Sequence, residues 1–247
     1  MTGGQREKAL EFLLKKSINI VAVVTPYPKK NSKFLKSITI AQDNRLNIIN
    51  VYKTDIYDQV SKISFDILIS CGFPYKIDKR TISLPKIIAI NVHPTLLPKY
   101  RGYMSGPYII INGEKESGVT IHKLEEQLDK GDIISQKKFE VTPFDTTKSV
   151  YRKAREIEPE LLYNSIISIK KGTIKLKKQN DKNSSEYSYI RTPKDSLIDQ
   201  NKSLIDLYNS IRACDYNDYP AFFYVEGEKV LVKLSREKKD DPFNDLI

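Results

Sequence analysis

The sequence predicts an α/β fold: a doubly wound, mostly parallel sheet with its first strand apparently missing, and a small C-terminal β-rich module. Short aliphatic runs alternate with helix-like segments over the first 170 residues or so, which is typical of a parallel sheet covered by helices on both faces. A helix-like segment directly follows Gly3 and Gly4, where such a fold normally has a strand and a turn. Either the first strand is absent, or the domain simply begins with a helix.

The elements follow from hydrophobic periodicity. We expect helices at residues 5–16, 33–43, 55–61, 106–112 and 146–170. We expect strands at residues 18–24, 46–51, 65–70, 87–90, 118–124 and 133–141. Pro159 lies within the longest helix, so a kink or a helix boundary is expected there.

The second half of the chain predicts a separate small module. Residues 178–188 are polar and poor in apolar groups, which is typical of an exposed linker. We therefore expect a catalytic domain at 1–177, a linker at 178–188 and a helix-plus-hairpin module at 189–247. The module would hold a helix at 203–213 and strands at 221–225 and 229–234.

Composition limits the possible classes of protein. The 41 basic and 31 acidic residues give a net charge of +10, which favours an anionic partner such as a sugar nucleotide, a polyglutamylated cofactor or RNA. The lysines are scattered, so a solvated basic surface is the simpler explanation. Two distant cysteines predict neither a disulfide framework nor a metal site. Neither a signal peptide nor a membrane span is recognisable, and we expect a cytoplasmic protein.

The motif NVHPTLLPKYRG, residues 91–102, carries the clearest chemistry. Asn91 and His93 leave an apolar strand two residues apart, so both side chains point the same way if both extend it. Pro94 and Pro98 then end regular structure, which places the pair at a carboxyl edge where open α/β sheets bind ligands. Asp129 follows in the run LDKGDII. An amide, an imidazole and a carboxylate together can manage acyl transfer to an amine.

These motifs resemble the formyl-tetrahydrofolate-dependent formyltransferases, which have a Rossmann-type fold. The similarity rests on NVHPTLLPKYRG, on GVTIHKLEEQLDKGDII, and on the 38 residues that separate Asn91 from Asp129. The resemblance implies that Asn91, His93 and Asp129 are the catalytic residues and that 10-formyltetrahydrofolate is the cofactor. It also implies a cofactor pocket formed by Phe73, Tyr75 and Lys76 on one side and by Asp132 and Ile133 on the other. His122 has a structural or substrate-facing role in this interpretation.

The stretches RGYMSGPY and YIRTPKDSLID are most similar to the sugar-nucleotide N-formyltransferases. The acceptor would then be the amine of a nucleotide-linked deoxy-amino sugar used in surface glycan and lipopolysaccharide assembly. Lys99, Arg101 and Tyr103 are the candidate substrate-binding residues, although packing roles for Arg101 and Tyr103 stay open. Family habit suggests a homodimer.

Two alternative functions remain. A methionyl-tRNA formyltransferase is the second choice, because the residues beyond the linker are too few for the larger C-terminal barrel expected in that enzyme. A basic nucleic-acid-binding protein on a vestigial formyltransferase fold is the third. The scattered charge disfavours RNA, and an intact Asn-His-Asp set has no purpose in a pure binding module.

Overall fold

The computed structural model describes residues 1–2, 4–215 and 217–237, which form two compact units. The first unit comprises Met1–His93, Val119–Lys137 and Arg155–Lys182. The second comprises Pro94–Gly118, Lys138–Ala154 and Asn183–Ile247. The predicted division into residues 1–177, 178–188 and 189–247 stays a prediction.

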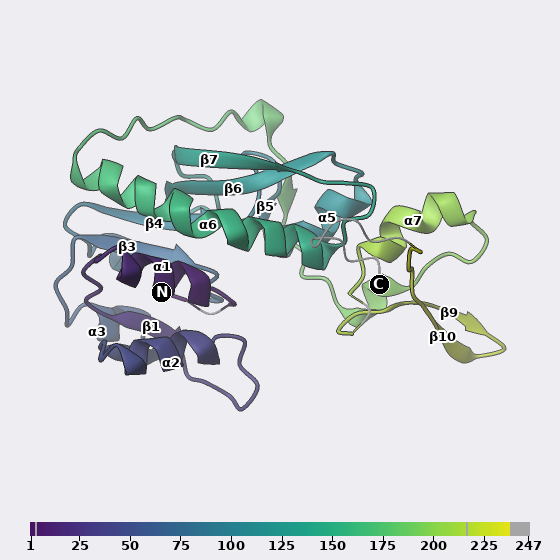
Figure 1. Cartoon of the computed structure of the whole chain (residues 1–247), viewed down its shortest axis with the longest axis horizontal. Coiled ribbons are helices and arrows are strands. Elements are labelled where there is room, and N and C mark those ends of the chain that lie inside the picture. Colours follow the sequence, from purple (N-terminus) through teal and green to yellow (C-terminus); the bar gives the residue numbers. More distant parts are fainter. Residues whose placement is uncertain (3, 216, 238–247) are drawn as a thin grey trace. The chain divides into compact units, whose positions relative to one another are not determined.

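The strands β1 to β4, β6 and β7 form two groups (Figure 1). Strands β1 (Val23–Pro26) and β2 (Ile48–Val51) form one parallel pair. A four-stranded sheet has the order β3-β4-β6-β7, with bounds Ile67–Cys71, Ile88–His93, Glu116–Lys123 and Ile133–Glu140. Strand β4 is parallel to β3 and antiparallel to β6. The predicted α/β class is therefore confirmed, with parallel and antiparallel pairs in one sheet.

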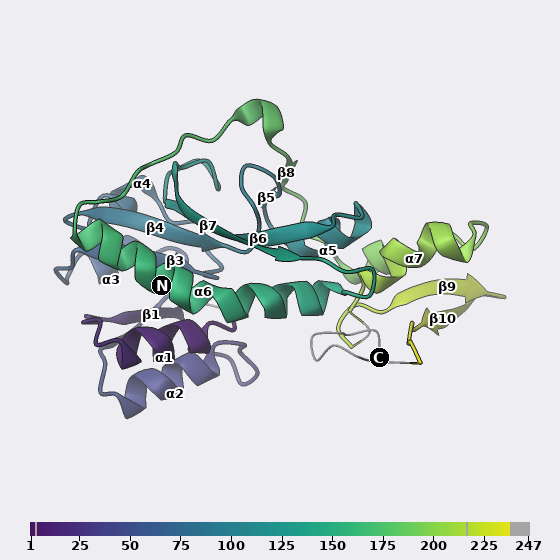
Figure 2. The same cartoon turned by 45° about the horizontal axis from the view of Figure 1, so that its top comes forward.

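Helices lie against these strands (Figure 2). Their bounds are α1 Glu7–Lys15, α2 Leu35–Asp43, α3 Ile56–Val60, α4 Lys79–Ile82 and α6 Thr147–Lys170. Helix α1 buries Ala9 and Leu13 on one face, as the apolar spacing predicts. Helix α6 runs through Pro159 without interruption, so the helix boundary considered at that proline is wrong.

Residues Met1 and Thr2 lie between β1 and β3. The Met1 amino group donates to the Ile69 carbonyl at 2.6 Å, and the Cys71 amide donates to the Met1 carbonyl at 3.0 Å. On the other side, the Thr2 amide donates to the Val24 carbonyl at 2.9 Å. A two-residue extended segment therefore joins β1 to β3, at the place of the strand that the sequence predicts to be missing.

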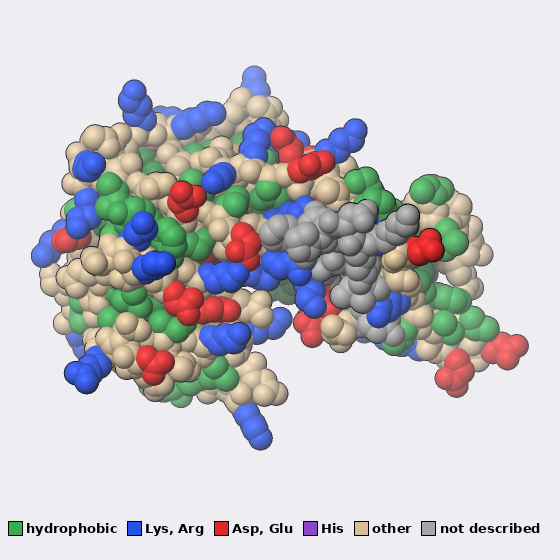
Figure 3. All heavy atoms as spheres, viewed as in Figure 1, with side chains coloured by type: hydrophobic (Ala, Val, Ile, Leu, Met, Phe, Trp, Pro, Cys, Tyr) green, Lys and Arg blue, Asp and Glu red, His purple; other side chains and the backbone are tan. Residues whose placement is uncertain are grey.

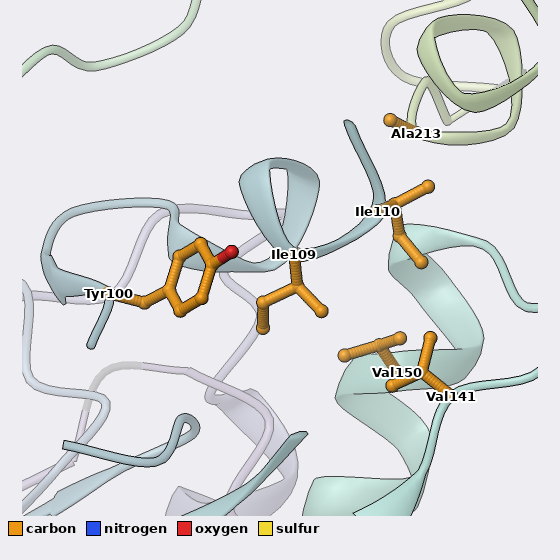
Figure 4. Packing of buried hydrophobic residues seen from close by; sticks show 6 residues of the cluster. All are labelled: Tyr100, Ile109, Ile110, Val141, Val150 and Ala213. Carbon is orange, nitrogen blue, oxygen red and sulfur yellow. The ribbon is translucent and has the colours of Figure 1, made fainter. Parts of the chain in front are cut away.

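The second unit contains short elements. These are β5 (Arg101–Gly102), α5 (Ser105–Ile111), β8 (Glu186–Tyr187), α7 (Leu204–Arg212), β9 (Ala221–Val225), β10 (Glu228–Val232) and a 3₁₀ turn at Pro193–Ser196. A further 3₁₀ turn, at Asp181–Asn183, begins in the last residues of the first unit. The predicted hairpin is confirmed, because β9 and β10 pair antiparallel. A core of Tyr100, Ile109, Ile110, Val141, Val150 and Ala213 holds these elements together (Figure 4).

The short parallel pair of β5 and β8 places part of the predicted linker in regular structure. Arg101 pairs with Glu186, and Gly102 pairs with Tyr187. Gly102 has φ 103°, and a Cβ there would lie 2.2 Å from the Tyr187 carbonyl oxygen. Only glycine permits this close approach of two backbones. The linker at 178–188 is therefore polar, as predicted, but residues 186–187 form a strand.

Candidate active site

Two alternate residues of β4 begin the candidate site. Asn91 and His93 both lie in this strand, so they share a face, as their spacing predicts. In the antiparallel register, Asn91 pairs with His122 and His93 pairs with Thr120 on β6. Strand β6 thereby brings a second imidazole to the same face of the sheet. His93 and His122 are 5% and 1% exposed, so both imidazoles are nearly removed from solvent.

The loop between β6 and β7 supplies Asp129 in a left-handed conformation with φ 55°. Aspartate tolerates this region better than most residues do. Gln179 holds the loop from outside, because its side-chain amide donates to the carbonyls of Asp129 at 2.8 Å and Gly131 at 2.7 Å. A Cβ at Gly131 would lie 1.9 Å from the Lys123 carbonyl oxygen. The backbone around Asp129 is therefore fixed on both sides.

Four polar side chains converge at this point. The amide nitrogen of Asn91 lies 3.1 Å from Nε2 of His122 and 3.3 Å from Oδ1 of Asp129. The other carboxylate oxygen, Oδ2 of Asp129, lies 3.5 Å from Nδ1 of His93. Oδ1 of Asp129 is also 3.4 Å from Nε2 of His122. The structure thus brings together Asn91, His93 and Asp129, together with His122.

The contacts of His122 define its proton position. Nδ1 of His122 lies 2.8 Å from the Lys123 carbonyl oxygen, and a carbonyl can only accept a hydrogen bond. Nδ1 therefore carries the proton, and in the neutral ring Nε2 accepts from the Asn91 amide. Because the ionised carboxylate of Asp129 also only accepts, the nitrogen of Asn91 must face both groups, and its carbonyl oxygen faces away.

The predicted cofactor residues belong to the same unit as this site. Phe73 and Tyr75 follow β3 and contact each other edge to face, with ring centroids 5.5 Å apart. Both are half-buried and pack against the cores beneath β1 and β3. Lys76 is exposed. The backbone carbonyl of Asp132 accepts a hydrogen bond from the Lys123 backbone amide, and Ile133 is buried at the start of β7.

The predicted acceptor-binding residues lie in the second unit. Lys99 is exposed and lies 3.4 Å from Glu114. Arg101 is 2% exposed, and its guanidinium is 3.4 Å from Glu186, which is the geometry of an arginine that braces the β5–β8 pair. Tyr103 is 40% exposed. A substrate-binding role for these three residues stays a prediction.

Two residues of the site have little signal in the sequence. The sequence predicts a strand around His122, but the contact of His122 with Asn91 depends on the antiparallel register of β4 and β6, which a single sequence does not define. Gln179 lies in a polar run that resembles a linker. Nothing in the sequence marks the contact of Gln179 with the Asp129 loop, because a polar run does not reveal which of its side chains contacts a distant loop.

Comparison with known proteins identifies the family. The family model described as formyl transferase matches residues 3–166. The chain is 31% identical to the methionyl-tRNA formyltransferase of Thermotoga maritima over 214 residues, which is 83% of this chain and 68% of that protein. The chain therefore belongs to the formyl transferase family, and the predicted enzyme class, a formyltransferase, is confirmed.

Further relatives differ in length and in what they act on. The bifunctional polymyxin resistance protein ArnA of Wigglesworthia glossinidia brevipalpis is 31% identical over 252 residues. The match spans 96% of this chain but only 38% of that protein. The crystal structure of a 4-N formyltransferase from Francisella tularensis is 26% identical, covers 96% of both chains and has a TM-score of 0.79. An N-formyltransferase from Helicobacter canadensis, in complex with folinic acid and dTDP-3-aminofucose, is 24% identical with a TM-score of 0.74 and coverages of 97% and 93%.

Proposed function

We propose that this formyltransferase moves a formyl group from 10-formyltetrahydrofolate to the amine of a nucleotide-linked deoxy-amino sugar, as a step in surface glycan assembly. The convergence of Asn91, His93 and Asp129 at the carboxyl end of β4 carries the proposal. Hydrogen-bond donors, an imidazole and a carboxylate meet there in a buried position. This donor set fits a carbonyl on which negative charge develops while an amine loses its proton.

The cofactor, when bound, supplies an activated formyl carbon. Asn91 is the donor for the formyl oxygen, because its amide nitrogen is held in a fixed direction by His122 and Asp129. Both amide hydrogens are committed to those two acceptors, so donation to the formyl oxygen requires one of the two contacts to lengthen. Removing one donor of this kind typically costs on the order of 100- to 1000-fold in rate.

His93 is the proton carrier of the proposed reaction. Its Nδ1 faces Asp129, so Nε2, at the opposite side of the ring, is the atom suited to take the proton that the amine loses. Asp129 orients the ring and stabilises its charged form through the same contact. General base catalysis of this type contributes about 100- to 10000-fold.

The structural relatives support a sugar nucleotide as the acceptor. The Francisella and Helicobacter proteins match this chain over more than nine tenths of both lengths, and the Helicobacter structure contains dTDP-3-aminofucose. In the second unit, Tyr103 exposes its ring, which suits contact with a sugar or a base. Tyr108 already stacks on Tyr187, with ring centroids 4.0 Å apart, so it offers a base one face at most.

Transfer to methionyl-tRNA is the second candidate, because several relatives near 30% identity are methionyl-tRNA formyltransferases. Figure 3 shows Lys and Arg side chains dispersed among acidic ones over the face in view, whereas RNA binding favours a concentrated basic surface.

The described residues contain no helix with the length and apolar character that a membrane-spanning segment needs. A homodimer remains part of the proposal.

One experiment separates the candidates. The protein is incubated with 10-formyltetrahydrofolate and, in parallel, with a panel of amino-sugar nucleotides, methionyl-tRNA and uncharged tRNA. The products are then analysed by mass spectrometry. A gain of one formyl group on an amino-sugar nucleotide is the expected result. Formylation of methionyl-tRNA alone would overturn the proposed acceptor, and a formyl group on neither would overturn both candidates.

A further inference from the structure

Tyr27 and Tyr52 form an exposed aromatic pair at the carboxyl ends of β1 and β2, the kind of edge where open α/β sheets bind ligands. The two strands are parallel, with Thr25 aligned to Asn50. The Tyr27 amide continues this ladder by donating to the Val51 carbonyl at 3.3 Å. The two rings stack with centroids 4.3 Å apart and an interplanar angle of 25°. They are 47% and 57% exposed, so the stack is formed but left uncovered.

An amide donor lies beside this aromatic pair. Because side chains alternate along a strand, Thr25 and Asn50 share one face with Tyr27 and Tyr52. The hydroxyl of the fully buried Thr25 donates to Oδ1 of Asn50 at 2.9 Å. This contact orients the half-buried Asn50 side chain and leaves its nitrogen as a donor. That nitrogen has no hydrogen-bond partner among the described residues.

Three exposed lysines surround the pair in sequence. Lys29 and Lys30 belong to the loop after β1, and Lys53 belongs to the loop after β2. None of the three forms an ion pair within the described part of the chain. The carboxylate of Asp55 lies at the second loop, where it accepts from the Tyr52 amide at 2.7 Å. The surface therefore combines an aromatic platform with an excess of positive charge.

We propose that Tyr27, Tyr52 and Asn50, together with these lysines, bind a nucleoside diphosphate. The base stacks on an outer face of the tyrosine pair, because an aromatic side chain can bind any base through its π-face. The Asn50 amide donates to a carbonyl oxygen at the edge of the base, which thymine and uracil both offer. The lysines attract the diphosphate. A nucleic-acid strand would need successive platforms, and one stacked pair provides a single platform.

This nucleotide site is separate from the candidate active site. Met1 and Thr2 lie between β1 and β3, and β3 lies between them and β4. At ~4.8 Å per strand, β1 is therefore about 14 Å from the strand that carries Asn91 and His93. The site does not depend on the identity of the formyl acceptor. The nucleotide comes either from solution or from the acceptor itself, and the recognised chemistry is the same.

The test is calorimetric titration with dTDP and UDP in the absence of cofactor and acceptor, with hydrogen exchange of residues 26–33 and 50–55 to locate the bound nucleotide. The unaltered chain should bind both nucleotides and show protection in both segments. Tyr27→Leu/Tyr52→Leu removes both rings, so affinity should fall about 10-fold or more and protection should be lost. Tyr27→Phe/Tyr52→Phe is the matched control, which keeps both rings and should bind as the unaltered chain does.

A second pair of variants tests the role of charge. Lys29→Gln/Lys53→Gln should weaken binding and reduce its dependence on salt. Lys86→Gln is the control, because Lys86 is also exposed but precedes β4 instead of following β1 or β2. Absence of nucleotide binding, or equal affinity and equal protection for the leucine variant and the unaltered chain, would overturn the proposal. A uridine oligonucleotide that binds through the two tyrosines while dTDP and UDP do not bind would overturn the occupant.

Kinetics of formyl transfer distinguish the two sources of the nucleotide. If the acceptor brings it, dTDP should inhibit competitively with the acceptor, and the leucine variant should have a raised KM for the acceptor. If it comes from solution, dTDP should bind with neither effect. Should no amino-sugar nucleotide be formylated at all, the proposed function fails, whereas the titration and exchange results still decide the nucleotide site.

Discussion

The side-chain nitrogen of Asn91 lies 3.1 Å from Nε2 of His122, across the antiparallel pair of β4 and β6. The Lys123 carbonyl fixes the proton of His122 on Nδ1, so the imidazole presents an acceptor to Asn91. His122 is therefore a positioning residue for the amide that we propose to contact the formyl oxygen. Its own contact with the reacting groups is not required.

Replacing His122 should reduce turnover without altering substrate binding. In His122→Phe the Asn91 amide loses one acceptor and its fixed direction, so kcat should fall about 10- to 100-fold, with KM for the acceptor little changed. His122→Gln retains a side-chain acceptor and should restore part of the rate. Lys123→Ala serves as the control, because the Lys123 side chain is half-exposed and its backbone carbonyl is retained. A changed KM with normal kcat would contradict this role.

The contact between His93 and Asp129 should be essential for formyl transfer. Asp129→Asn keeps the shape of the side chain but removes the charge that faces Nδ1 of His93 at 3.5 Å. We expect a loss of about 100-fold or more in kcat, and a similar loss for His93→Ala. Circular dichroism and the thermal midpoint should show that both variants fold. Turnover near that of the unaltered protein in either variant would exclude the proposed mechanism.

Gln179 should support the site from a distance through the backbone of the Asp129 loop. Gln179→Ala removes two hydrogen bonds, to the Asp129 and Gly131 carbonyls. The free energy of unfolding should fall by about 1–2 kcal/mol, and kcat should fall by about 10-fold as Asp129 loses its fixed position. The neighbouring Lys178 is exposed, so Lys178→Ala is a suitable control. Equal kinetics for the two variants would show that the Asp129 loop keeps its conformation without Gln179.

The sequence predicted the elements whose signal is local and repeated. Strand β4 begins in the aliphatic run at residues 87–90. Helix α6 keeps its apolar stripe for 24 residues despite Pro159, because packing along the whole helix outweighs one lost hydrogen bond. Helix α4 and the two-residue strands β5 and β8 have no such signal. They form because distant residues meet, as when Gly102 lies against Tyr187.

The site residues also fall into two groups: those that a local sequence signal predicts, and those that depend on contacts between distant residues. The positions of Asn91 and His93 follow from alternation along one strand, whereas Asp129 follows only from a motif spaced along the chain. The participation of His122 depends on how β6 is aligned with β4. That alignment is a property of the assembled sheet, and one residue of slippage would turn His122 to the opposite face.

The amino group of Met1 should make stability depend on pH. Burial lowers its pKa from the ordinary value of 8.0 to about 6, partly offset by the neighbouring Cys71. Between pH 6 and pH 8 the unfolded chain therefore binds more protons than the folded chain, so the free energy of unfolding should increase with pH across that window. Cys71 stays a thiol there, because burial and the nearby Glu158 raise its pKa well above the usual value.

Urea unfolding at pH 6, 7 and 8 measures this effect. Arg6 and Glu158 lie 3.4 Å from each other, and other ionisable groups contribute to the pH profile as well, so a reference chain is needed. The chain with an acetylated amino terminus has an amide in place of the Met1 amine and retains every other titratable group. Its stability should rise less between pH 6 and pH 8 than that of the unacetylated chain. Parallel pH profiles for the two chains would show that the Met1 amine keeps its ordinary pKa and is hydrated in the folded protein.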